Sequence, residues 1–169
     1  MTVGVGDSSP ALVGNKLYTF GRQETNEVIS CIDAVSGKVL WQEIYPAQFV
    51  VTGVSSRHPG TRSSPVVADG KLCVLGVGGI LSCVDATSGK VLWADTAARG
   101  QSAAIVDAGS CLIALAVNGE LSIYLPSDKQ YIELAHYKVG DPEIWAHPIV
   151  SGKSIFVRDK ESVTLWSME

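Results

Sequence analysis

The chain has 169 residues, with 13 basic and 17 acidic side chains and a formal net charge of −4. This length predicts a single domain, and the acidic balance argues against a nucleic-acid-binding surface, which is normally basic. Hydrophobic residues make up 46% and charged residues 18%, which excludes a disordered chain. The longest apolar runs are short and interrupted by Gly, Ser or Asp, so no membrane span is predicted.

The chain begins with a short segment, Thr2–Val5, ahead of the first regular pattern. The first residues lack the basic region and the apolar stretch of a signal peptide, so we expect no signal peptide in this chain.

Two long stretches repeat each other almost residue for residue. Residues 29–41 read ISCIDAVSGKVLW and residues 81–93 read LSCVDATSGKVLW. Upstream, Ser8–Pro10 recurs as Ser63–Pro65 at a longer offset, so we expect an insertion in a loop of the first copy, around residues 21–27. The positions that match between the two copies include Asp33 with Asp85, Gly37 with Gly89 and Trp41 with Trp93.

The second copy shows the strand pattern most clearly. Short runs rich in Val, Leu and Ile alternate with turns that contain Gly, which predicts antiparallel hairpins. The expected strands are Pro65–Ala68, Lys71–Leu75, Ile80–Ala86 and Lys90–Ala94. Four such short strands bury little surface alone, so each unit must stack its faces on neighbouring units.

Two weaker copies follow, and Gly70, Gly109 and Gly152 mark the same turn in successive copies. A period of roughly 40 residues with short strands and Gly-rich turns predicts an all-β fold, a β-propeller of four-stranded antiparallel blades. With about four blades in one domain, the chain is either half of an eight-bladed ring or a small propeller. The domain spans residues 1–169, and the expected blades cover residues 8–45, 62–95, 102–138 and 147–169.

The fourth copy ends after its third strand. Propellers commonly close by pairing an N-terminal strand into the last blade, because an open sheet edge is a liability. We therefore expect Thr2–Val5 to complete the fourth blade, in the same chain or in a partner.

The cysteines lie in strand-like runs: Cys31, Cys73, Cys83 and Cys111. None belongs to a C-x-x-C pair or stands at metal-ligand spacing from a histidine, so no metal site is expected. Because Cys in a strand behaves as a small apolar residue, we expect buried thiols rather than disulfides.

The motif Cys-x-Asp-x-x-Ser-Gly-Lys-x-x-Trp of the two strong copies resembles the tryptophan-docking repeat of the pyrroloquinoline-quinone-type (PQQ-like) β-propellers, A-x-D-x-x-T-G-K-x-x-W. Cys in place of Ala and Ser in place of Thr are mild changes. The stretch from Gly60 to Trp93 is also similar to bacterial exported propellers of the outer-membrane assembly lipoprotein type. The resemblance to the PQQ-like repeat covers essentially the whole chain, with the third and fourth copies degenerate. The family link suggests a periplasmic or other extracytoplasmic location.

Each docking residue has a mechanical reason in the sequence. Asp33 and Asp85 end a strand, where a short acceptor caps the amides of the following turn. The two glycines of the motif adopt positive φ without steric cost. By the resemblance, Trp41 and Trp93 lie flat between adjacent blades, where an indole covers apolar surface and offers one donor to a neighbouring carbonyl.

The enzymes with this fold are quinone-dependent dehydrogenases, which hold the quinone with Ca²⁺, a catalytic Asp and often two adjacent cysteines. This sequence has no adjacent cysteines and no evident carboxylate–amide cluster for calcium. We therefore expect neither pyrroloquinoline quinone nor calcium as a cofactor, and assign no catalytic residue. A fragment or degenerate relative of such a dehydrogenase stays open as the alternative.

One inter-blade segment, residues 54–62, carries candidate ligand-binding side chains: Arg57, His58 and Arg62. Such links cross the face of a propeller towards its channel, and His147 stands at a comparable place before the fourth blade. These residues either bind an anion or an acidic peptide, or solvate the loop and bond its backbone.

The sequence as a whole predicts a non-catalytic β-propeller scaffold for protein–protein interaction, with a protein partner or with itself. A four-plus-four homodimer would cover the apolar flanks of the first and last blades.

Overall fold

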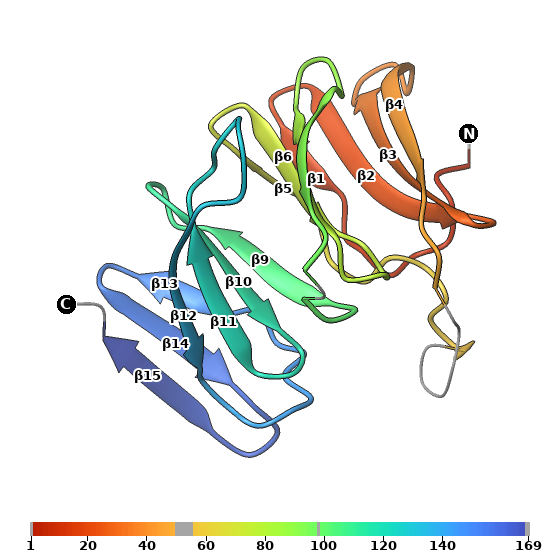
Figure 1. Cartoon of the computed structure of the whole chain (residues 1–169). Helices are drawn as coiled ribbons and strands as arrows, with labels where there is room; N and C mark the ends of the chain where they lie inside the picture. The colour runs from red at the N-terminus through yellow and green to blue at the C-terminus, as the bar shows by residue number, and fades with distance from the viewer. Residues whose placement is uncertain (1, 50–55, 98, 168–169) are drawn as a thin grey trace.

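The chain folds into a row of antiparallel β-sheets that fan out like the blades of a propeller (Figure 1). This computed structural model describes residues 2–49, 56–97 and 99–167. Blade one holds β1 (Ala11–Val13), β2 (Lys16–Gln23), β3 (Asn26–Asp33) and β4 (Val39–Pro46). Blade two holds β5 (Val66–Ala68), β6 (Lys71–Leu75), β7 (Leu81–Asp85) and β8 (Val91–Asp95). Blade three holds β9 (Ala103–Asp107), β10 (Leu112–Ala116), β11 (Glu120–Tyr124) and β12 (Glu133–Lys138), and blade four holds β13 (Ile149–Ser151), β14 (Ser154–Arg158) and β15 (Val163–Ser167).

The strands of each blade are paired in sequence order, and the first strand of each is the inner one. The inner strand β1 lies against β5, and β5 lies against β9. Blades one and four stand at the two ends of the arc, with the two ends of the chain far apart (Figure 1). Among the described residues there is no helix long and apolar enough to cross a membrane.

Apolar side chains from facing sheets fill the space between successive blades. Tyr18, Phe20 and Ile29 of blade one pack with Leu72 and Val74 of blade two. A second core joins blades two and three, and a third joins blades three and four. Because strands buried on both faces need apolar residues at nearly every position, the near-continuous runs in β6 and β10 follow from this stacking.

The extra residues of the first repeat do not form a longer loop. They lengthen β2 and β3 into eight-residue strands, which remain paired out to Gln23 and Asn26. The expected insertion around residues 21–27 is therefore a strand extension with a tight turn.

Thr2–Val5 does not complete blade four within the same chain, which corrects that part of the expectation. Val5 and Arg22 exchange backbone hydrogen bonds of 2.8 Å, so the segment lies on blade one. Gly21 and Gly60 make room for it, because a Cβ at either position would stand within 2.2 Å of a backbone oxygen of Val3 or Val5. Blade four has three strands among the described residues, and β15 lies at its edge.

The outward faces of the two end blades are apolar and uncovered. On blade one, Leu12, Leu40 and Ile44 are between 47% and 62% exposed. On blade four, Phe156 is paired with Ile149 and Leu165 across the sheet, and all three are exposed on one face. Surfaces of this kind are typical of an interface.

Candidate functional site

The two docking turns have the same hydrogen-bond pattern. The Asp33 carboxylate accepts the backbone N–H and the hydroxyl of Ser36, each at 2.7 Å, and Asp85 does the same with Ser88. These bonds lower the pKa of both aspartates. The glycine that follows has positive φ in each turn.

Both motif tryptophans point towards the next blade. The Trp41 indole lies on Gly89, where an added Cβ would stand 2.5 Å from Trp41 Cε3. Trp93 donates its Nε1–H to the Ser127 carbonyl of blade three at 2.8 Å. The indole nitrogen of Trp41 is buried without a hydrogen-bond partner, so the two contacts differ in polarity. Gly37 has no atom within 4 Å of its added Cβ, so no indole covers the corresponding turn of blade one.

A cavity of about 660 Å³ opens where the links between blades meet. Its walls come from the residues that precede all four inner strands and from the β10–β11 turn. Asp7, Arg62 and Trp145 stand at the same distance before the inner strands that begin at Ala11, Val66 and Ile149. The polar and aromatic lining residues are Asp7, His58, Arg62, Gln101, Ser102, Glu143, Trp145 and His147.

Polar contacts hold the part of the cavity wall that precedes blades one to three. The His58 ring nitrogen Nδ1 lies 2.8 Å from an Asp7 carboxylate oxygen. Arg62 donates to the His58 carbonyl at 3.2 Å and to the Gln101 side chain at 3.3 Å, and its Cζ lies 5.5 Å from the Phe49 ring centre. Burial lowers the pKa of Arg62, against the opposing effect of Asp7. One guanidinium nitrogen, Nη2, is buried without a hydrogen-bond partner.

The part of the wall that precedes blade four presents an aromatic side chain. Trp145 is 58% exposed. Glu143 beside it forms an ion pair with Lys160 and has a positive φ of 77°. The backbone N–H groups of Glu143 and Ile144 both donate to the Val117 carbonyl, which holds this link against blade three.

The structure places three of the four face residues expected from the sequence in one cavity. His58, Arg62 and His147 line it, whereas Arg57 is exposed and is not among the lining residues. Residues 54–55 of that segment lie outside the described residues. The sequence reasoning missed Asp7, Gln101 and Trp145, although alignment of the residues before each inner strand would have brought them out.

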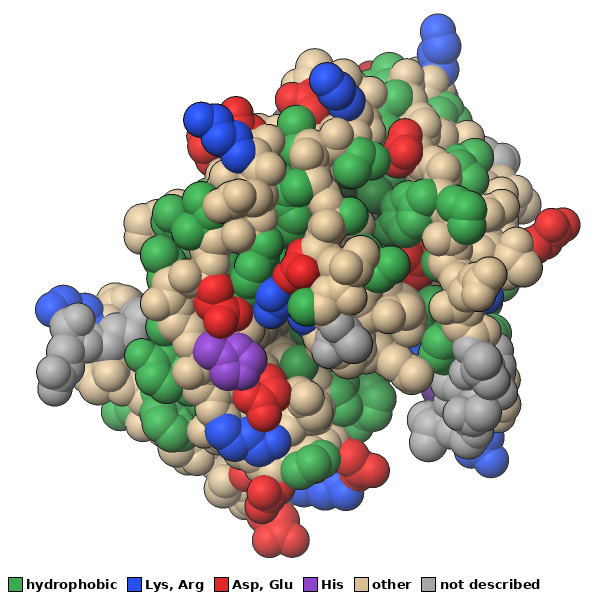
Figure 2. Space-filling model, in the orientation of Figure 1, with side chains coloured by type: hydrophobic (Ala, Val, Ile, Leu, Met, Phe, Trp, Pro, Cys, Tyr) green, Lys and Arg blue, Asp and Glu red, His purple; other side chains and the backbone are tan. Residues whose placement is uncertain are grey.

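A smaller cavity, of about 180 Å³, lies between blades two and three. Figure 2 shows charged side chains and a histidine gathered around it. Its floor is apolar, and the polar lining residues are Arg99, Asn118, Glu120, Ser122 and His136.

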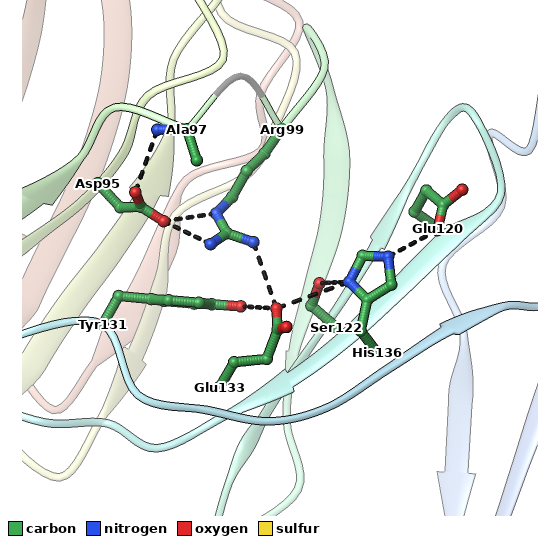
Figure 3. Close-up of polar contacts among 8 residues, drawn as sticks. All are labelled: Asp95, Ala97, Arg99, Glu120, Ser122, Tyr131, Glu133 and His136. Carbon is green, nitrogen blue, oxygen red and sulfur yellow. Dashed lines mark hydrogen bonds and ion pairs between the residues drawn. The ribbon is translucent and has the colours of Figure 1, made fainter.

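The charged side chains at its rim are paired with one another (Figure 3). Arg99 stacks on Tyr131, with 3.8 Å from Cζ to the ring centre, and forms ion pairs with Asp95 and Glu133. The hydrogen bond from Tyr131 lowers the pKa of Glu133. His136 bridges the rim, with 2.6 Å to Glu120 and 3.1 Å to Ser122. This network ties the link after β8 to β11 and β12, and it leaves few charges free for a ligand.

The described residues do not supply the cluster of acidic side chains that a calcium site needs. No group of three or more His, Cys, Asp or Glu residues in this part of the chain is close enough to hold a metal ion. The acids of the larger cavity, Asp7 and Glu143, face His58 and Lys160 instead.

Comparison with known proteins identifies a family and relatives of this chain. A family model described as the outer membrane protein assembly factor BamB matches residues 2–162. The protein of that name from Shigella dysenteriae serotype 1 (strain Sd197) is 24% identical over 156 residues, covering 88% of this chain and 38% of that protein. The chain thus spans well under half the length of this curated relative.

Solved structures share the fold at low sequence identity. BamB from Moraxella catarrhalis matches with a TM-score of 0.69 at 15% identity, over 98% of this chain and 45% of that one. The computationally designed Ika4 protein matches with a TM-score of 0.69 at 13% identity, over 99% of this chain and 96% of that one.

Proposed function

The chain belongs to the family of the outer membrane protein assembly factor BamB, and from this premise we propose that it is a non-catalytic propeller scaffold that binds another protein through its larger cavity. The observation that carries the proposal is the convergence on that cavity of the segments that precede all four inner strands, three of which are inter-blade links. A binding surface built from loops on a rigid scaffold is a common arrangement in proteins.

The cavity wall favours a segment of a protein chain over a small anion. The side chains that could hold an anion are partly engaged, since His58 faces Asp7 and Arg62 already holds Gln101. What remains available is a largely exposed indole, Trp145, beside the partly exposed guanidinium of Arg62. Trp and Arg are enriched among the residues that dominate protein–protein binding energy. The expected ligand is a segment with an apolar side chain for Trp145 and an oxygen acceptor for Arg62.

Site-specific photo-cross-linking tests this surface in cells that express the chain. A benzophenone amino acid replaces Trp145 in one variant and Val35 in another. Val35 is the matched control, because it is 86% exposed on the β3–β4 turn, away from the cavity. We expect one discrete protein adduct from position 145 that is lost when Arg62→Glu is added. Equal labelling from both positions, or no adduct from position 145, would contradict the proposal.

We further infer that two copies of the chain close one ring. Nearly the whole of this chain matches the Moraxella catarrhalis propeller, and the match covers just under half of that propeller. An arc of this extent leaves two end faces open, and both carry exposed apolar residues such as Ile44 and Phe156. In a two-fold arrangement, blade four of each copy packs on blade one of the other.

Light scattering on the purified chain tests ring closure. We expect a dimer for the wild type and monomers for Ile44→Glu and for Phe156→Lys alone. An equimolar mixture of these two variants should restore a heterodimer, because one of its two interfaces is then wild type and the other pairs Glu with Lys. A wild-type monomer at all concentrations would refute the dimer and leave the protein-binding proposal intact.

A further inference from the structure

Two cysteines of blade two lie directly opposite each other on neighbouring strands. Cys73 of β6 is paired with Cys83 of β7. The hydrogen bonds from Gly76 N–H to Ile80 O and from Ala86 N–H to Gly70 O fix the phase of this antiparallel ladder. Because hydrogen-bonded and non-hydrogen-bonded pairs alternate, Cys73 and Cys83 form a non-hydrogen-bonded pair, in which Cα atoms are about 4.5 Å apart and side chains are closest.

Both side chains are fully buried in the core between blades two and three. Their thiols contact each other: hydrogen bonding from Cys73 lowers the pKa of Cys83, and the same contact raises the pKa of Cys73. Cys83 is therefore the more acidic of the two thiols. This sulfur also approaches the Ser127 carbonyl, at 3.8 Å, and the indole of Trp93 donates to the same oxygen.

We propose that Cys73 and Cys83 are an oxidisable pair that closes into a cross-strand disulfide within blade two. A disulfide needs Cβ atoms about 3.5–4.5 Å apart, which a directly opposed pair reaches with a small shift. The other two thiols have no such partner in register, because Cys31 is paired with Tyr18 and Trp41, and Cys111 precedes β10.

A small organic disulfide can serve as the oxidant that closes the Cys73–Cys83 bond. The Cys83 thiolate attacks one sulfur of the oxidant, whose S–S bond breaks and releases one thiolate. Cys73 then loses its proton and attacks Cys83 Sγ, which releases the second thiolate and forms the intrachain bond. Two electrons pass to the oxidant, and the two protons lost by the cysteines are taken up by its thiolates. Because both sulfurs are buried, the reaction waits for transient opening of the hairpin.

The disulfide has two structural consequences. It links β6 to β7 across the hairpin whose turn carries Val77, so it restrains the unfolded chain and raises the melting temperature. It also removes the Cys83 S–H donor from the Ser127 carbonyl and places a disulfide next to Trp93, which changes the fluorescence of that indole.

Oxidation of the folded, full-length chain with bis(2-hydroxyethyl) disulfide tests the proposal. After removal of the oxidant, the protein is unfolded, alkylated and mapped by mass spectrometry. We expect a peptide pair linked through Cys73 and Cys83, a higher melting temperature and altered tryptophan emission, all reversed by dithiothreitol. Cys31→Ser and Cys111→Ser should keep this behaviour, and Cys73→Ala should abolish it.

The peptide map of the wild type decides the question even where a cysteine variant fails to fold. Cys111 is only partly buried, so its reaction with the oxidant shows that the treatment was effective. If Cys73 and Cys83 both remain alkylatable after that, the pair does not close. A crosslink to Cys31 or Cys111 instead, or closure that requires denaturant, would equally overturn the assignment.

Discussion

The Glu27 carboxylate of blade one accepts the backbone N–H of Val77 in blade two, at 2.6 Å from Oε1 to nitrogen. Glu27 is 1% exposed, and Gly76 packs against it so closely that an added Cβ would stand 2.2 Å from Oε2. The carboxylate thus replaces water for an amide in the β6–β7 turn. A side chain of one blade fastens the turn of the next, beside the apolar contacts that the blades share.

Glu27→Gln should make the free energy of unfolding less dependent on pH. Burial raises the pKa of Glu27 above its value in the unfolded chain, against the effects of Val77, Tyr45 and Arg22. Stability from a raised pKa is fully present below the unfolded pKa and is lost as pH rises through the folded one. Gln keeps an oxygen for Val77 without the charge, so the variant should gain stability over the wild type at about pH 8 and not at about pH 4. Urea unfolding at both pH values measures this, and an equal difference at each would contradict the burial effect.

Gly76→Ala should destabilise the chain, whereas Gly78→Ala in the same turn should not. The added methyl group at residue 76 would overlap the Glu27 carboxylate, which costs about 1–3 kcal/mol. At residue 78 the nearest heavy atom is 3.5 Å away, so the expected change is within about 0.5 kcal/mol. Denaturant midpoints compare the two variants, and similar losses would show that the turn, and not the carboxylate, is sensitive.

The propeller fold could be predicted from the sequence because the signals that define each blade are local. Short apolar runs and Gly turns determine each hairpin, and β6 begins and ends where the pattern of Lys71–Leu75 predicts. The length of the strands in the hairpin of β2 and β3 was harder to predict, because three added residues extend paired strands as readily as they extend a loop. There, Gly21 pairs with Val28 and continues the ladder.

The candidate site could be predicted only in part from the sequence, because it depends on contacts between distant segments. Arg62 and His58 stood out as charges in one link, but their cavity also needs Asp7, Gln101 and Trp145 from other links. These come together only once the blades fan around a common centre. The placement of Thr2–Val5 likewise depends on a groove that Gly21 and Gly60 leave open.

Arg62→Ala should lower the melting temperature, while Arg57→Ala should leave it nearly unchanged. Arg62 is partly buried and donates to the His58 carbonyl and to Gln101, so its loss removes two hydrogen bonds, at about 0.5–1.5 kcal/mol each. Arg57 is exposed and lies outside the cavity wall, so the expected effect is within about 0.5 kcal/mol. Thermal unfolding measures both, and equal shifts would contradict a structural role for Arg62.

Adding pyrroloquinoline quinone and Ca²⁺ should neither raise the melting temperature nor give dye-linked alcohol oxidation. A ligand that binds only the folded state stabilises it by mass action, so thermal unfolding reports binding even without turnover. The acids nearest the larger cavity, Asp7 and Glu143, already face cationic or imidazole groups. A stabilising shift that requires both additions would favour a degenerate dehydrogenase over a scaffold.

Gly89→Ala should destabilise the chain more than Gly37→Ala, and the difference measures the docking of Trp41. Both glycines follow the same Asp-capped turn and have positive φ, 77° and 69°, so the backbone strain of alanine is shared. Only at residue 89 does the new methyl group meet the indole, 2.5 Å from Trp41 Cε3. The extra loss should be about 1–3 kcal/mol.

Urea unfolding of the two variants, each also made with Trp41→Phe, separates strain from docking. With the smaller ring, the difference between the two alanine variants should shrink, because there is less aromatic surface to displace from residue 89. Equal losses for both variants in the presence of Trp41 would mean that the indole moves aside freely. The contact between blades one and two would then rest on the apolar core, on the bond from Tyr18 to the Ala86 carbonyl and on the bond from the Val77 N–H to Glu27.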